Sequence, residues 1–209
     1  MTLLVVTAVE AEADAVRASA DPGQVTVEAV GAGPAAAAAG TARLLALAEA
    51  AGRPFRAVVS AGIAGGFAGR ARVGATVIGV RSIAADLGAE SPEGFLPIDS
   101  LGFGSSVRPA DGNLVEALIT ALPHAVTGDV LTLATVTGTA ETAARLAAAH
   151  PDAVAEAMEG FGVASAAVAA GVPFAELRTV SNVIGPRDRS AWRLADAFAA
   201  LGAAAEFLG

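Results

Sequence analysis

Leu3-Leu4-Val5-Val6-Thr7-Ala8-Val9 forms the first apolar run of the chain, and Glu10-Ala11-Glu12-Ala13-Asp14 follows it at once. The run is nearly continuous instead of alternating, which is typical of a strand that is covered on both faces. The Ala-rich continuation predicts a helix over residues 10–20, whose first-turn carboxylates favour the positive end of the helix dipole. A buried strand that passes directly into a helix indicates an α/β protein with a parallel sheet.

The same alternation continues along the whole chain. Further strands are predicted at residues 25–30, 57–61, 76–83, 130–137, 153–157 and 175–181. Further helices are predicted at residues 34–51, 112–121, 140–148, 160–170 and 189–207. Pro34 suits the first turn of its helix, and Asp111 and Thr139 are suitable N-cap residues. Together these elements predict one domain over residues 1–209, with three α/β/α layers around a mainly parallel, mixed sheet.

Residues 86–108 interrupt this rhythm. The segment is rich in Gly and Pro and shows neither the helical nor the strand period. Phe95, Leu96, Ile98, Leu101 and Phe103 make it too apolar for a solvated tether. Long loops inside compact domains are usually functional, so we expect this one to pack on a ligand or on a second subunit.

Composition and charge exclude several classes of function. The 209 residues include 13 Arg and no Lys against 21 Asp and Glu, so the net charge is −8, which disfavours nucleic acid and anionic membrane as partners. The absence of Cys and the presence of only two His disfavour a metal centre and a thiolate nucleophile. Residues 163–175, the most apolar stretch, are too short and too interrupted to span a bilayer. We expect a cytoplasmic protein with no metal and no cofactor.

Polar and Gly-containing turns are expected where the predicted strands end, which is where α/β proteins bind ligands. Each of them alone has a simpler explanation as a helix cap or a tight turn. A dinucleotide fingerprint at residues 31–36 is disfavoured because no acidic residue ends a second strand about 20 residues on. The turns are Val9-Glu10-Ala11-Glu12, Gly31-Ala32-Gly33-Pro34, Gly62-Ile63-Ala64-Gly65-Gly66, Met158-Glu159-Gly160 and Arg178-Thr179-Val180-Ser181-Asn182.

Taken in order, these segments resemble the methylthioadenosine/S-adenosylhomocysteine nucleosidase branch of the purine nucleoside phosphorylase-like superfamily. The resemblance extends over nearly the whole chain, and three departures from it are informative. Ile63 replaces a Ser of the glycine loop, Ala157 replaces the first Glu of a V-E-M-E motif, and Asn182 replaces the Asp that protonates adenine. With the extension at residues 185–189, this pattern resembles the futalosine hydrolases of the alternative menaquinone pathway, which release hypoxanthine from a nucleoside with a carboxylated aromatic tail.

The resemblance implies a role for each matching residue. Glu12 would be the base that activates water, in preference to Glu10, and Arg178 would position the water or the carboxylate. Glu159 would accept hydrogen bonds from the ribose hydroxyls, with Met158 against the sugar face. The other implied substrate-binding residues are Val9, Ala32, Gly62, Ile63, Val136, Thr137 and Trp192.

The chemistry of an amide supports a 6-oxopurine substrate independently of this resemblance. Asn182 offers one donor and one acceptor on a planar group and cannot serve as a protonated acid. Its amide nitrogen can donate to O6 of hypoxanthine while its oxygen accepts from N7–H. A mismatched base would leave buried polar groups unpaired, so such a pair can discriminate strongly.

Several alternatives stay open at this point. The chain could act on methylthioadenosine or S-adenosylhomocysteine, could be a phosphate-dependent phosphorylase, or could bind nucleosides without catalysis. Arg70 and Arg72 are interpreted as surface residues rather than phosphate ligands. The tail carboxylate would need a cationic partner, and the resemblance also implies a homo-oligomer. Four arginines are candidates for that partner: Arg81, Arg108, Arg187 and Arg189.

Overall fold

The first apolar run forms strand β1 (Leu3–Thr7), which is buried along its whole length. Leu3 and Val5 belong to one hydrophobic cluster and Leu4 and Val6 to another, because successive side chains of a strand point to opposite faces. A computed structural model, which describes residues 1–208, therefore confirms that this strand is covered on both faces.

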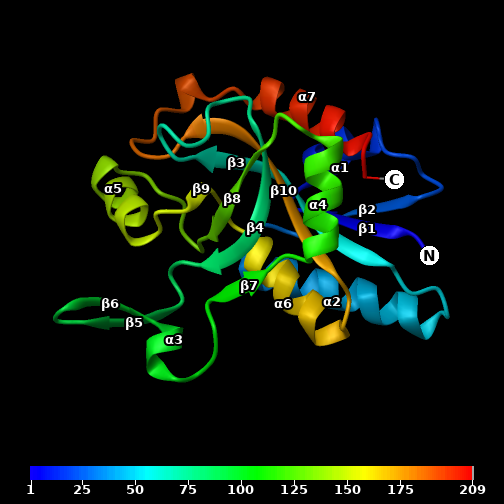
Figure 1. Ribbon diagram of the computed structural model, residues 1–209, viewed down its shortest axis with the longest axis horizontal. Coiled ribbons are helices and arrows are strands. Elements are labelled where there is room, and N and C mark those ends of the chain that lie inside the picture. The colour runs from blue at the N-terminus through cyan, green and yellow to red at the C-terminus, as the bar shows by residue number, and fades with distance from the viewer. Residues whose placement is uncertain (209) are drawn as a thin grey trace.

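The other elements follow in the predicted alternation (Figure 1). The remaining strands are β2 (Val25–Ala29), β3 (Ala57–Gly66), β4 (Thr76–Ala84), β5 (Gly88–Ser91), β6 (Gly94–Pro97), β7 (Val107–Pro109), β8 (Val126–Thr132), β9 (Ala153–Ala157) and β10 (Phe174–Val183). The helices are α1 (Glu10–Arg17), α2 (Pro34–Ala50), α3 (Ile98–Leu101), α4 (Gly112–Ala121), α5 (Ala140–Ala149), α6 (Gly160–Ala170) and α7 (Leu194–Ala205), with a 3-10 turn η1 at Arg189–Ala191.

Helices cover both faces of the central sheet, which confirms the three-layer prediction. Helices α1, α4 and α7 place Val16, Leu118 and Leu201 in the same cluster as Leu3 and Val5. Helices α2 and α6 pack together on the opposite face, in the cluster of Leu4 and Val6. Figure 1 shows α1 and α7 on one side of the strands and α2 and α6 on the other.

The sheet is mixed and partly closed. Its strand order is β10-β4-β8-β9-β3-β1-β2, with β7 added to β4, and β10 also pairs with β3. Five strands, β3, β10, β4, β8 and β9, therefore form a ring, while β1 and β2 extend from β3. The parallel pairs are β1–β2, β1–β3, β3–β10, β4–β8 and β8–β9, and the antiparallel ones are β4–β10, β3–β9 and β4–β7.

The predicted N-caps are confirmed. The Asp111 carboxylate accepts from the backbone N–H groups of Asn113 and Leu114 at the start of α4. The Thr139 hydroxyl accepts from the N–H of Thr142 at the start of α5. These bonds satisfy donors that a helix cannot satisfy internally, which fixes where both helices begin.

Three boundaries differ from the predictions. Strand β3 continues to Gly66, so the glycine-rich residues 62–66 are strand and not a turn. Strand β8 runs from 126 to 132, earlier than predicted. The predicted helix over 189–207 is interrupted. It begins as η1, whose N-cap Asp188 accepts from the Ser190 N–H, and the chain is extended at Trp192, which follows η1.

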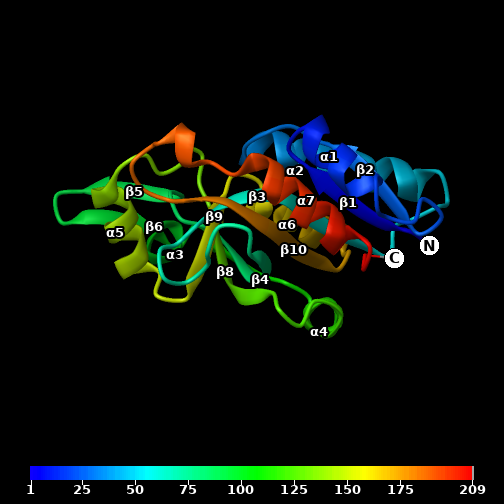
Figure 2. The ribbon, with the colours of Figure 1, turned by 90° about the horizontal axis from the view of Figure 1, so that it is seen from above.

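The segment 86–108 is not irregular throughout. It contains the hairpin β5–β6, the single-turn helix α3 and the short strand β7 (Figure 1). The hairpin projects at the end of the molecule away from the termini (Figure 2). Phe95 and Leu96 of the hairpin are 44% and 39% exposed, and Phe103 is 81% exposed. Within residues 1–208, no helix has the length and apolar character needed to cross a membrane.

Candidate active site

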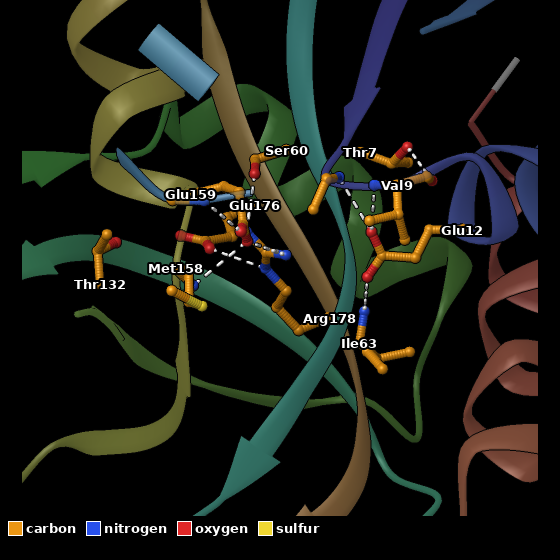
Figure 3. A network of polar contacts seen from close by, with 12 residues as sticks. Thr7, Val9, Glu12, Ser60, Ile63, Thr132, Met158, Glu159, Glu176 and Arg178 are labelled. Atoms are coloured by element: carbon orange, nitrogen blue, oxygen red, sulfur yellow. Dashed lines mark hydrogen bonds and ion pairs between the residues drawn. The ribbon is translucent and has the colours of Figure 1, made fainter. Parts of the chain in front are cut away.

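Glu12 is turned back from α1 over the end of β1. Its Oε2 accepts from the N–H groups of Ala8 at 2.9 Å and Val9 at 3.3 Å. Its Oε1 accepts from the N–H of Ile63 on β3 at 2.9 Å (Figure 3). The residue is only 4% exposed. Three backbone donors, two from the turn between β1 and α1 and one from β3, thus hold a buried carboxylate in one orientation.

The surroundings of Glu12 favour a carboxylate that can take up a proton. Burial is the largest influence and raises the pKa of Glu12 above its ordinary value of 4.5. The bond from Ile63 and the charge of Arg178 lower the pKa, while the charge of Glu159 raises it. A carboxylate with a raised pKa is a stronger base than an exposed one, which suits a general base.

Arg178 lies at the centre of the site and is fully buried on β10. Its Nε donates to Glu176 Oε1 at 2.9 Å and its Nη2 to Ser60 Oγ at 2.9 Å. Its Nη1 contacts Glu159 Oε2 at 3.4 Å. A guanidinium is always charged and presents donors in a fixed fork, so Arg178 fixes the relative positions of the acidic side chains.

Gly62 is the point at which Glu12 and Arg178 come together. A Cβ atom at this position would lie 2.6 Å from Glu12 Oε1 and 2.9 Å from Arg178 Nη1. A side chain at position 62 is therefore excluded, because the carboxylate and the guanidinium occupy the space that it would need. This accounts for a glycine inside a strand, where glycine is otherwise unfavourable.

Glu159 reaches the same cluster from the other helical layer. It ends the connection between β9 and α6, and its Oε1 accepts from the N–H of Gly33 at 3.1 Å. Its Oε2 accepts from the N–H of Met158 at 3.2 Å and contacts Arg178. The predicted meeting of Glu12 and Glu159, which are far apart in the sequence, thus occurs around one buried arginine (Figure 3).

Sequence reasoning missed Glu176. This residue is fully buried, bonds to Arg178, and also accepts a short hydrogen bond from Ser82 Oγ. Burial raises its pKa, and Arg178 opposes that rise. Its spacing of two residues from Arg178 on one strand was the available signal, because such residues share a face of the sheet.

Asn182 lies further along β10 and does not contact this acidic cluster. Its Oδ1 accepts from Ser181 Oγ at 2.9 Å, and its Nδ2 donates to the carbonyl of Val183 at 3.1 Å. Thr137 is held by Glu156 on β9, and Val136 beside it is 40% exposed. The predicted base-contacting residues therefore form a second group, separate from the predicted sugar-contacting residues.

The remaining predicted residues lie in different surroundings. Val9 contributes a backbone donor to Glu12, and its side chain is 47% exposed. Ala32 is exposed in the loop that carries the Gly33 donor. Trp192 lies near the guanidinium groups of Arg187 and Arg189, at 5.9 and 5.8 Å from its ring centre.

The structure tests the predictions for two charged residues, Glu10 and Arg70. Glu10 is exposed and pairs with Arg17, so it is not placed to compete with Glu12. Arg70 is not a solubilising surface residue, because its guanidinium donates to the carbonyls of Ala147, His150 and Ala153. It satisfies acceptors at the end of α5, so the interpretation as a surface residue was wrong for Arg70.

A cavity of about 940 Å³ lies beside β4 and β8 and next to the end of β10. Its lining includes Arg70, Arg72, His124 and Phe207, and none of the predicted site residues. Within residues 1–208, no cluster of three or more His, Asp or Glu is arranged to hold a metal ion. The acidic cluster around Arg178 is therefore the better candidate for chemistry.

Comparisons with known proteins identify the family of this chain. Residues 6–207 match the model of the phosphorylase superfamily. A futalosine hydrolase from Streptomyces coelicolor is 53% identical over 96% of this chain and 92% of its own length. A 5′-methylthioadenosine/S-adenosylhomocysteine nucleosidase from Colwellia psychrerythraea, solved with adenine, superposes with a TM-score of 0.81 at 23% identity, covering 99% of this chain and 94% of that one. The futalosine hydrolase of Helicobacter pylori superposes with a TM-score of 0.82 at 15% identity, covering 100% and 97%. The chain belongs to the phosphorylase superfamily and, within it, to the futalosine hydrolase family.

Proposed function

We propose that this protein hydrolyses the N-glycosidic bond of futalosine, releasing hypoxanthine and dehypoxanthine futalosine in the menaquinone pathway. The 53% identity to a futalosine hydrolase over nearly the full length of both chains supports the substrate. The observation that carries the chemistry is the convergence of Glu12, Arg178 and Glu159 on one buried point.

Cleavage of this bond requires a nucleophile and a stabilised sugar cation. As the bond from C1′ to N9 breaks, its electron pair goes to the purine, which takes up a proton from solvent at N7, and positive charge develops on the ribose. Water attacks C1′ and gives a proton to the Glu12 carboxylate. The carboxylates of Glu12 and Glu159 lie in a desolvated site, so they stabilise the sugar cation more than they would in water.

Arg178 acts as a positioning residue in this proposal. Its guanidinium holds Glu159 by one edge and is fixed by Glu176 and Ser60 at the others. Glu159 in turn can accept hydrogen bonds from the ribose hydroxyls. Because Arg178 balances part of the negative charge, Glu12 can stay ionised despite its burial.

Water is the favoured nucleophile over phosphate. The cluster contains three carboxylates, on Glu12, Glu159 and Glu176, around a single guanidinium that Glu159 and Glu176 already occupy. A phosphate anion in the same place would be repelled by these charges and would find no free cationic partner there. This argument disfavours the phosphorylase alternative.

Asn182 selects the base in this proposal. Replacing it by Asp (Asn182→Asp) is expected to lower the rate of hypoxanthine release from futalosine and to raise the release of adenine from methylthioadenosine. A carboxylate accepts from the amino group of adenine but cannot donate to O6 of hypoxanthine. Chromatography of the released bases measures the ratio, and an unchanged base preference would exclude Asn182 as the selecting residue.

The structure also narrows the choice of partner for the carboxylate of the aromatic tail. Arg81 is already paired with Asp129 at 2.5 Å and with Asp152 at 3.4 Å. Arg108 lies over the ring of Phe161 and donates to a backbone carbonyl. The two exposed arginines beside Trp192 are thus favoured, since an aromatic acid can stack on the indole and pair with a guanidinium. They are Arg187 and Arg189.

Trp192→Ala is expected to raise KM for futalosine several-fold, because a stacked aromatic contact contributes about 0.5–1.5 kcal/mol. The released base should still be hypoxanthine, and kcat should change little. Trp192→Phe, which keeps an aromatic ring, is the matched control. Steady-state kinetics on both variants check this, and an equal KM for all three proteins would remove Trp192 from the tail site.

One assay distinguishes the proposed function from its alternatives. The purified protein is incubated with futalosine, inosine and methylthioadenosine, with and without phosphate, and the products are identified. Free hypoxanthine from futalosine without phosphate is the expected result. Formation of a sugar 1-phosphate would indicate a phosphorylase, preferential release of adenine would indicate the other nucleosidase, and binding without turnover would indicate a regulator.

We propose in addition that the protein acts in the cytoplasm as a homo-oligomer. The exposed Phe95, Leu96 and Phe103 support the assembly, because they offer apolar side chains at one end of the molecule to a second copy.

A further inference from the structure

Glu156 is a buried carboxyl group that the mechanism above does not use. It is 4% exposed on β9, and both of its oxygens accept from a single residue. Oε1 accepts from the backbone N–H of Thr137 at 2.8 Å, and Oε2 accepts from its hydroxyl at 2.6 Å. Among residues 1–208 no cation pairs with this carboxylate.

Burying a carboxylate without a cation costs free energy, and a neutral amide could hold a loop at lower cost. Asp129, a buried carboxylate on the neighbouring strand β8, has Arg81 as its partner. Glu156 thus differs from a purely structural acid of the same sheet. Groups of this kind are enriched at functional sites.

The position of Glu156 links it to the base-binding group. Gly65 on β3 pairs with Glu156 on β9 on one side and with Asn182 on β10 on the other. Asn182 Nδ2 and Glu156 Cγ each lie 3.6 Å from the point where a Cβ of Gly65 would be. A methyl group of Ile184 lies over the same point. Glu156 and Asn182 therefore lie on either side of the apolar contact between Gly65 and Ile184.

We infer that Glu156 sets the specificity of the base site by holding both hydrogen-bond donors of Thr137 away from the ligand. This inference rests on the proposed function. With its N–H and O–H directed to Glu156, Thr137 offers a ligand only acceptors, namely its carbonyl and the free lone pairs of its hydroxyl. Hypoxanthine carries a proton on N1, which needs an acceptor, whereas N1 of adenine is itself an acceptor. Glu156 and Asn182 thus recognise the 6-oxopurine from opposite sides.

Product inhibition tests this inference, because the two products report on separate halves of the site. Glu156→Ala is expected to weaken inhibition by hypoxanthine roughly 10-fold or more, since a hydrogen-bond network with a charged group is worth about 1.5–3 kcal/mol. Inhibition by adenine should not weaken, because the freed Thr137 N–H can donate to N1 of adenine. Inhibition by dehypoxanthine futalosine should stay unchanged. Glu156→Gln, which can still accept from the Thr137 N–H, should restore part of the hypoxanthine affinity, and Thr137→Val should lose part of it.

Asp129→Asn provides the matched control for the loss of a buried carboxylate from the sheet. It is expected to lower the melting temperature without changing the ratio of hypoxanthine to adenine inhibition. An unchanged ratio in Glu156→Ala, or equal weakening of all three inhibitors, would overturn the inference. Calorimetry measures the binding of hypoxanthine to the wild-type and variant proteins without any turnover, so this test is separate from that of the proposed function. The proposed function fails only if the wild-type protein does not hydrolyse futalosine.

Discussion

Glu12→Gln is expected to lower kcat for futalosine hydrolysis by about 10²–10⁴-fold, the usual contribution of a general base. Glutamine preserves the size of the side chain, and its one carbonyl oxygen can accept either from the N–H groups of Ala8 and Val9 or from that of Ile63. It cannot take a proton from water. KM should change little, because the substitution removes an interaction made in the transition state. Steady-state kinetics with quantified hypoxanthine measure the effect.

Glu10→Gln is the matched control, since Glu10 is two residues away, exposed, and paired only with Arg17 on the surface. It should leave kcat and KM unchanged. The pH profile provides a second check. Burial raises the pKa of Glu12 above 4.5 and the base must be ionised, so activity is lost as the pH falls through this raised pKa. The acid limb of the pH profile should therefore lie above pH 4.5 and disappear in Glu12→Gln. Equal loss of activity in Glu12→Gln and Glu10→Gln would contradict the assignment of Glu12 as the base.

Arg178→Met is expected to lower the free energy of unfolding by about 3–5 kcal/mol and to abolish activity. Methionine fills a similar volume but leaves Glu176 and Glu159 buried without their cation, and breaking a buried ion pair on one side has this typical cost. Neither carboxylate is accessible to water, since Glu176 is fully buried and Glu159 is 6% exposed. Urea-induced unfolding measures the change.

The double variant Arg178→Met with Glu176→Gln separates charge from packing. Removing the second charge should restore part of the lost stability, because the fully buried carboxyl group of Glu176 is then replaced by a neutral amide. Activity should not return, since Glu159 and Glu12 still lack the guanidinium that orients them. Stability equal to that of the single variant would show that packing, and not an unpaired carboxylate, causes the loss.

Much of this fold could be predicted because hydrophobic runs and helix caps are local signals. The continuous apolar run at 3–7 and the caps at Asp111 and Thr139 lie where the pattern indicated. The glycine-rich residues 62–66 were predicted as a turn, because glycine usually marks one. In the structure, residue 62 lies in a strand, and it must be glycine because Glu12 and Arg178 occupy the space that a side chain would need. That contact depends on segments more than 100 residues apart and has no local signal.

The candidate site shows the same division. Glu12, Arg178 and Glu159 could be predicted as site residues because their motifs occur in a characteristic order. The geometry that joins them could not be predicted. Glu176 and Glu156 went unnoticed because a charged residue in an apolar strand is apparent only once burial is known. The strand order, in which β10 pairs with both β3 and β4, decides which residues become neighbours. Pairings of this kind follow from tertiary packing and not from periodicity.

The account is tested most directly by a crystal structure of the Glu12→Gln variant with intact futalosine. It predicts C1′ of the ribose beside a water held by the side chain at position 12, with the ribose hydroxyls on Glu159. The hypoxanthine should lie between Asn182 and Thr137. A nucleoside bound instead in the 940 Å³ cavity beside His124 and Phe207, or a ribose that contacts neither position 12 nor Glu159, would contradict it.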